Sequence, residues 1–112
     1  MNLEFSKAGT ALVVRVVDSR IDAHGTPDLK AKVGERIDNG DHRIVFDLAN
    51  VELVDSTGLG GILSLLKRLP RGGNVVFCGC RPAVIEVLKL TRLDRVFAVV
   101  ETVQEAVASL GS

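Results

Sequence analysis

Apolar residues are distributed along the chain in two patterns: short continuous runs, and longer stretches in which they recur about every four positions. Continuous runs are typical of buried strands, and they predict strands at residues 43–48, 75–77 and 97–100. Two further strands, separated by Gly9-Thr10, are predicted to form a hairpin from residues 3–6 and 11–17. The periodic stretches predict helices around residues 27–39, 56–69, 82–90 and 103–110.

The order of these elements predicts the fold class. Strands that alternate with helices favour parallel pairing with right-handed crossovers. We therefore expect one α/β domain over residues 1–112, in the order ββαβαβαβα, with a mixed β-sheet whose N-terminal hairpin forms an antiparallel edge. The sequence also predicts the N-cap residues of two helices. Thr26 is one, because a proline and an acid follow it, and Thr102 is the other, because it opens a capping box.

The segment from Asp55 to Gly61 is the most unusual part of this pattern. It places a carboxylate and two adjacent hydroxyls, on Ser56 and Thr57, where an extended segment turns into a helix, and then sets three glycines into the start of that helix. Glycine costs about 0.8–1.0 kcal/mol relative to alanine inside a helix. Two interpretations stay open: the glycines let the helix pack closely against its sheet, or they clear space for another molecule at the hydroxyls.

The position of this segment favours a functional role. In open α/β sheets, ligands and partners meet the loops beyond the carboxyl ends of the strands. The turn at Asp55 and Ser56 leaves a strand at that edge, and so does the loop that contains Asp22. A phosphate added to a hydroxyl there would meet the positive end of the helix dipole, an interaction worth about 0.3–1 kcal/mol. The alternative is that Ser56 or Thr57 only caps the helix.

Composition narrows the range of functions. Fourteen basic residues balance fourteen acidic ones, the basic residues are scattered, and Trp and Tyr are absent, which argues against a nucleic-acid partner. Apolar stretches fall far short of the ~20 residues of a membrane span, and the N-terminus does not resemble a signal peptide. We therefore expect a cytoplasmic protein with no membrane partner. Cys78 and Cys80 lack the further ligands of a zinc site, so we expect two reduced thiols.

The segment does not match a catalytic arrangement. A nucleophilic Ser56 would need a base and an orienting group, and the only histidines in the sequence are His24 and His42. The surrounding residues match neither the G-x-S-x-G elbow nor the phosphate-binding loop G-x-x-x-x-G-K-[ST]. We therefore expect no catalysis at this segment.

The same residues resemble a known family. Asp55-Ser56-Thr57-Gly58-Leu59-Gly60, followed by an apolar helix, is similar to the signature of the STAS-domain anti-sigma factor antagonists. The resemblance extends to Arg20-Ile21-Asp22-Ala23 before the first helix and to the later segments 43–48, 72–78 and 82–93. It implies a STAS-like fold.

The resemblance also implies a bacterial partner-switching regulator. In that family the unphosphorylated antagonist binds a serine-kinase anti-sigma factor and thereby frees a sigma factor. The kinase then phosphorylates the serine after the aspartate, here Ser56, and so releases the antagonist, and a PP2C-type phosphatase reverses the modification. ATP and Mg²⁺ belong to the kinase, so the resemblance implies that this chain is not an enzyme and has no metal, cofactor or small-molecule substrate. The implied partner-binding residues are Asp22, Asp55, Ser56, Thr57, Gly58, Leu59 and Gly60.

Two features of the chain depart from the family pattern. Ser19-Arg20 stands where the family usually has Gly-Glu, and Thr57 is a second candidate phosphoacceptor beside Ser56. The resemblance is compatible with two alternative functions. One is a STAS accessory subunit that docks on an ABC-type ATPase for lipid transport without being phosphorylated. The other is a partner switch that controls secretion rather than a sigma factor.

Overall fold

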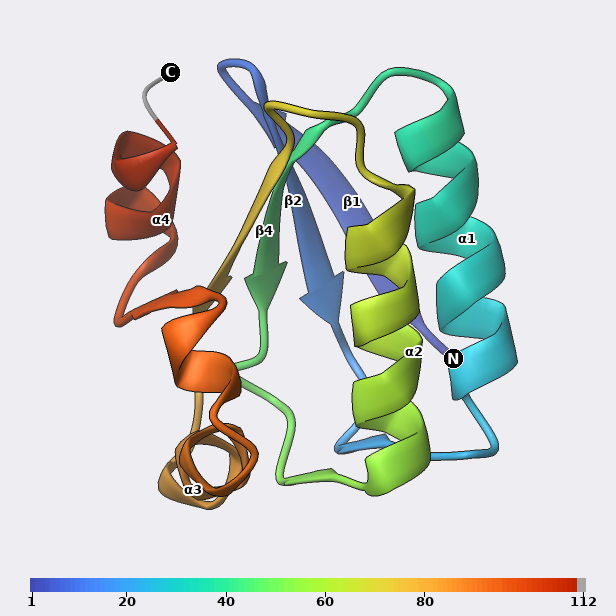
Figure 1. The fold of residues 1–112 in the computed structure, drawn as a ribbon, viewed down its shortest axis with the longest axis vertical. Helices are drawn as coiled ribbons and strands as arrows, with labels where there is room; N and C mark the ends of the chain where they lie inside the picture. The colour runs from blue at the N-terminus through green and yellow to red at the C-terminus, as the bar shows by residue number, and fades with distance from the viewer. Residues whose placement is uncertain (111–112) are drawn as a thin grey trace.

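Figure 1 shows the computed structural model, which describes residues 1–110 as a central sheet with helices on both faces. The sheet has five strands in the order β1-β2-β4-β6-β7. The hairpin of β1 and β2 is an antiparallel edge, and the remaining pairs are parallel. The strands are β1 (Leu3–Ala8), β2 (Ala11–Val16), β4 (Arg43–Asp47), β6 (Asn74–Cys78) and β7 (Ala98–Val100). The predicted fold class and its hairpin edge are confirmed.

The helices cover both faces of the sheet and one of its ends. α1 (Thr26–Asp38) and α2 (Ser56–Arg68) lie side by side over one face, and α4 (Val103–Ser109) covers part of the other (Figure 1). α3 (Pro82–Leu90) and the short 3-10 helix η1 (Leu93–Arg95) lie toward the carboxyl ends of the parallel strands (Figure 1). None of the helices within residues 1–110 is long and apolar enough to cross a membrane.

The central strands are buried on both faces, as their continuous apolar runs predict, and this produces two cores. The larger core lies between the sheet and the layer of α1 and α2. There the rings of Phe46 and Phe77 stack with their centroids 5.7 Å apart, and Phe97 meets Phe77 edge-on at 4.9 Å. The smaller core, which includes Val45 and Val76, lies under α4. Side chains on both faces of β4 and β6 therefore pack into a hydrophobic core and stabilise the sheet.

A second, two-stranded sheet is the main feature that the apolar pattern does not predict. β3 (Arg20–Ile21) and β5 (Leu53–Val54) pair in parallel, separately from the five-stranded sheet. We call this pair the β3–β5 ribbon. Each strand has only two residues, too few for the alternation of apolar and polar residues by which strands are recognised in a sequence.

The N-cap residue of α1 is not the one that the sequence predicts. Gly25 is the N-cap residue, and Thr26 lies inside the first turn. The Thr26 hydroxyl donates to the main-chain oxygen of Asp22 at 2.6 Å, so it closes the preceding loop instead of capping the helix. The N-cap prediction for Thr26 is therefore wrong. The prediction for Thr102 is confirmed, because its hydroxyl accepts a hydrogen bond from the amide of Glu105 at 3.1 Å.

Candidate functional site

The turn at Asp55 and the loop at Asp22 lie side by side because the β3–β5 ribbon joins the segments that lead into them. In the ribbon Ile21 is opposite Val54. One residue further on, the amide of Asp55 donates to the main-chain oxygen of Ile21 at 3.1 Å. The two segments singled out in the sequence are thus held together at the edge where the parallel strands have their carboxyl ends (Figure 1).

Asp55 is the residue that caps α2. Its Oδ1 accepts a hydrogen bond from the amide of Gly58 at 2.7 Å, and its Oδ2 accepts one from the amide of Ala23 at 3.3 Å. The first bond satisfies one of the amides that a helix N-terminus leaves unpaired. The helix cap is therefore provided by the carboxylate, and the alternative in which Ser56 or Thr57 caps the helix is wrong.

Ser56 and Thr57 occupy the first two positions of α2, and both are exposed. Within residues 1–110 neither side-chain hydroxyl has a hydrogen-bond partner. Both hydroxyls are therefore open to an approaching molecule. Either hydroxyl can therefore be modified without breaking a side-chain hydrogen bond within residues 1–110.

The three glycines of α2 have different surroundings. A Cβ at Gly58 would collide with the main-chain oxygen of Ile21 and would lie 2.8 Å from its Cγ2. A Cβ at Gly61 would collide with Cγ2 of Thr26, whereas a Cβ at Gly60 would meet nothing within 4 Å. Close packing therefore explains two of the glycines, although the partners are β3 and α1 and not the large sheet. Gly60 is the glycine that leaves open surface beside the hydroxyls.

The residues implied to bind a partner differ in exposure. Ser56, Thr57 and Gly60 are exposed, while Gly58 and Leu59 are buried, the latter with 8% of its surface accessible. Leu53, which precedes the motif on β5, is 44% exposed although it is a large apolar residue. Sequence reasoning does not single out Leu53, because only the pairing of the ribbon determines which way its side chain faces.

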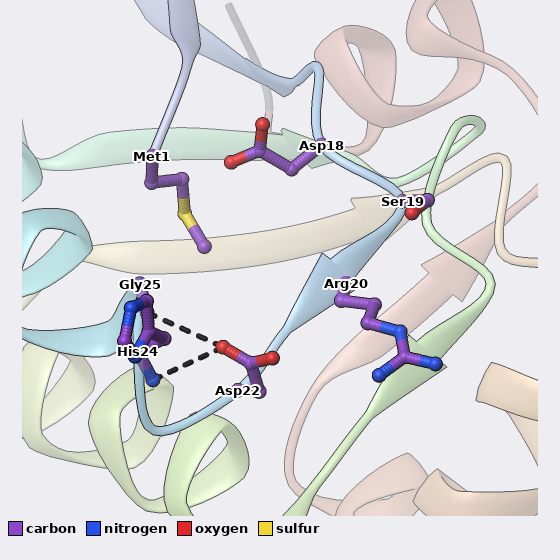
Figure 2. A pocket seen from close by; sticks show the side chains of 7 residues that line it. All are labelled: Met1, Asp18, Ser19, Arg20, Asp22, His24 and Gly25. Atoms are coloured by element: carbon purple, nitrogen blue, oxygen red, sulfur yellow. Dashed lines mark hydrogen bonds between the residues drawn. The ribbon is translucent and has the colours of Figure 1, made fainter.

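Residues 22–25 connect β3 to α1, and we call them the Asp22 loop. A hollow of about 350 Å³ adjoins this loop (Figure 2). The side chains of Asp18 and Asp22 point toward it from opposite sides, and Arg20 points away (Figure 2). Oδ1 of Asp22 accepts hydrogen bonds from the amides of His24 at 3.0 Å and Gly25 at 3.3 Å, which shapes the loop that enters α1. The hollow is lined by Met1, Asp18, Ser19, Arg20, Asp22, His24 and Gly25.

The two cysteines do not line this hollow, and both are free thiols. Burial, with a smaller contribution from the nearby Asp47 carboxylate, raises the pKa of Cys78 to about 12 and the pKa of Cys80 to about 11. A raised pKa keeps a thiol protonated and unreactive near neutral pH. Residues 1–110 contain no cluster of three or more His, Cys, Asp or Glu side chains arranged to hold a metal ion.

Comparison with known proteins identifies the family. The model of the STAS domain matches residues 2–106, which is nearly the whole chain. The chain therefore belongs to the STAS domain family.

Individual relatives carry a more specific description. A candidate anti-sigma factor antagonist of Bordetella bronchiseptica, BtrV, is 25% identical over 99 residues, which cover 88% of this chain and 85% of that protein. The crystal structure of a candidate anti-sigma factor antagonist from Thermotoga maritima has a TM-score of 0.87 at 26% identity and covers 98% of this chain and 95% of its own.

A third neighbour has been solved in two modification states. The anti-sigma factor antagonist SpoIIAA, from Bacillus, superposes with a TM-score of 0.83 in its unphosphorylated form and 0.75 in its phosphorylated form, each at 20% identity. Both forms cover 97% of this chain, and this chain covers 96% and 99% of theirs. At that identity the likeness concerns the fold alone.

Proposed function

We propose that this chain is an anti-sigma factor antagonist. In its unphosphorylated form it binds a serine-kinase anti-sigma factor and so frees a sigma factor. The kinase phosphorylates Ser56, the complex separates, and a PP2C-type phosphatase resets the chain. The protein acts in the cytoplasm as a binding partner and substrate, not as an enzyme. Its partner-binding surface comprises Asp22, Asp55, Ser56, Thr57, Gly58, Leu59 and Gly60.

The observation that carries this proposal is that Asp55, and not Ser56, caps α2. A phosphate on Ser56 therefore adds charge at an exposed position without removing the hydrogen bond on which the helix N-terminus depends. The helix dipole favours an anion at that end. The open space at Gly60 gives a partner's backbone or a phosphate donor room to approach the hydroxyl.

Electrostatic repulsion is large enough to separate the complex. A phosphate adds about −1.5 to −2 charges at pH 7. A carboxylate at roughly 5 Å, with an effective dielectric constant near 20, is repelled by about 3 kcal/mol per unit charge. The total of about 5–6 kcal/mol is comparable with the ~5.5 kcal/mol that shifts an equilibrium from 99:1 to 1:99. Release of the partner therefore requires no refolding of the antagonist.

The test is to incubate the chain with ATP, Mg²⁺ and the serine-kinase anti-sigma factor from the same genome, and to measure the intact mass. The parent chain should gain one phosphate. Ser56→Ala should gain none and still bind the kinase, whereas the matched variant Thr57→Ala should be modified like the parent. Phosphorylation of Ser56→Ala at the parent rate would contradict the assignment of Ser56 and would make Thr57 the acceptor.

A further inference from the structure

The Asp55 carboxylate does more than cap a helix, because its two oxygens bond to two different segments. Oδ1 accepts from the amide of Gly58 in α2 at 2.7 Å, and Oδ2 accepts from the amide of Ala23 in the Asp22 loop at 3.3 Å. Asp55 is only partly exposed, and Ser56 follows it directly. One side chain thus connects the start of α2, where the proposed phosphoacceptor lies, to the loop that carries Asp22.

The other hydrogen bonds of residues 22–25 lie within the loop or lead into α1. The Asp22 carboxylate accepts from His24 and Gly25, and the Asp22 main-chain oxygen accepts from the amide and the hydroxyl of Thr26. The Asp55 amide also bonds to Ile21, just before the loop. Among the hydrogen bonds described for residues 22–25 themselves, the bond from Ala23 to Asp55 is the one that reaches the N-terminus of α2. The β3–β5 ribbon brings Asp22 and Ser56 to the same edge, and the Asp55 carboxylate holds the loop beyond Ile21 against the start of α2.

We infer that Asp55 is a positioning residue, which acts through Ala23 and Gly58, and that it transmits the charge state of Ser56 to the Asp22 loop. This inference rests on the proposed phosphorylation of Ser56. A phosphate on Ser56 repels the adjacent carboxylate and competes with it for amides of the first helical turn. The longer bond, to Ala23, breaks before the shorter bond to Gly58. Phosphorylation therefore frees the Asp22 loop and leaves the helix cap intact.

The bridge is tested first in the free chain by amide hydrogen exchange. Asp55→Asn keeps one carbonyl oxygen, which retains the shorter bond to Gly58, and presents an NH₂ group that cannot accept from Ala23. Exchange at Ala23 should accelerate about three- to tenfold, as expected for losing a long hydrogen bond of ordinary net strength. Exchange at Gly58 should change less, because Asn still offers that amide a neutral acceptor. Asp94→Asn, which removes an exposed carboxylate from η1, is the charge-matched control and should change neither amide. An unchanged rate at Ala23 in Asp55→Asn would overturn the inference.

Transmission is tested by a double-mutant cycle in the same measurement. Ser56→Asp introduces a negative charge without a kinase, and Ser56→Ala is its neutral control. Ser56→Asp should accelerate exchange at Ala23 in the parent background and have no further effect in the Asp55→Asn background. If Ser56→Asp acts equally in both backgrounds, the charge reaches the loop by another route and the inference is wrong.

Kinetics with the kinase separate a positioning role from direct participation. Asp55→Asn should raise KM for the antagonist severalfold and leave kcat unchanged, because the loop is displaced while the acceptor hydroxyl stays in place. A fall in kcat at constant KM would show that Asp55 acts at the acceptor itself and would overturn the inference. If the parent chain is neither bound nor phosphorylated by the kinase, the proposed function fails, while the exchange measurements still decide whether the bridge and its transmission exist.

Discussion

The same substitution should have opposite effects at two glycines that are two residues apart in α2. Alanine gains about 0.8–1.0 kcal/mol over glycine inside a helix. At Gly60 that gain is unopposed, because a Cβ meets nothing within 4 Å. At Gly58 a Cβ collides with the main-chain oxygen of Ile21 and lies 2.9 Å from its carbonyl carbon. The collision involves backbone that the β3–β5 ribbon holds in place, so a change of rotamer cannot relieve it.

The expected magnitudes follow from these contacts. Overpacking in a well-packed site costs about 1–3 kcal/mol, and more where the backbone must shift. Gly58→Ala should therefore destabilise the fold by about 1–2 kcal/mol after the gain in helix propensity is subtracted. Gly60→Ala should stabilise it by up to about 1 kcal/mol. At about 4–8 °C per kcal/mol for a domain near this size, a gap of about 2 kcal/mol should separate the melting temperatures of the two variants by about 8–16 °C.

Urea denaturation followed by circular dichroism measures both variants against the parent chain. The slopes of the transitions should agree, so that the difference in midpoint reports stability alone. Gly60→Ala should also bind the partner more weakly despite its higher stability, because its new methyl group projects into the proposed interface. The reasoning would be refuted if Gly58→Ala were at least as stable as the parent chain.

Three further predictions concern contacts around the site and the thiols. Gly61→Ala should destabilise the fold, and Thr26→Ser in the same chain should recover much of the loss on a melting curve, because it removes the methyl group that collides and keeps the hydroxyl. Asp22→Asn should change the melting temperature little, since it retains an acceptor for the two loop amides, whereas Asp22→Ala should cost about 1 kcal/mol. Because their pKa values are raised to about 12 and 11, Cys78 and Cys80 stay protonated in the fold. Both should react slowly with a disulfide reagent at pH 8 until urea is added, and stability should fall as pH rises above the ordinary thiol value of 9.0.

The sequence predicts those features that depend on neighbours along the chain. Apolar runs identify the strands of the five-stranded sheet, and the alternation of strands and helices gives its parallel pairing. The order of elements also brings Asp22 and Ser56 to one edge. The capping role of Asp55 and the reasons for Gly58 and Gly61 are different, because they depend on Ile21, Ala23 and Thr26, which are more than 30 positions away. No local pattern reports such contacts, so the two interpretations of the glycines could be separated only in three dimensions.

The β3–β5 ribbon constrains how this surface can diversify in evolution. Residues 17–19 join β2 to β3, residues 48–52 join β4 to β5, and the amide of Glu52 bonds to the oxygen of Ser19 at 2.7 Å. An inserted residue that either connection fails to absorb would slide one strand by about 3.3 Å and reverse the faces of its side chains. Ile21 and Val54, now 0% and 5% exposed, could not both remain buried. We therefore expect this surface to change its partners by substitution of side chains more readily than by insertions or deletions in these two connections.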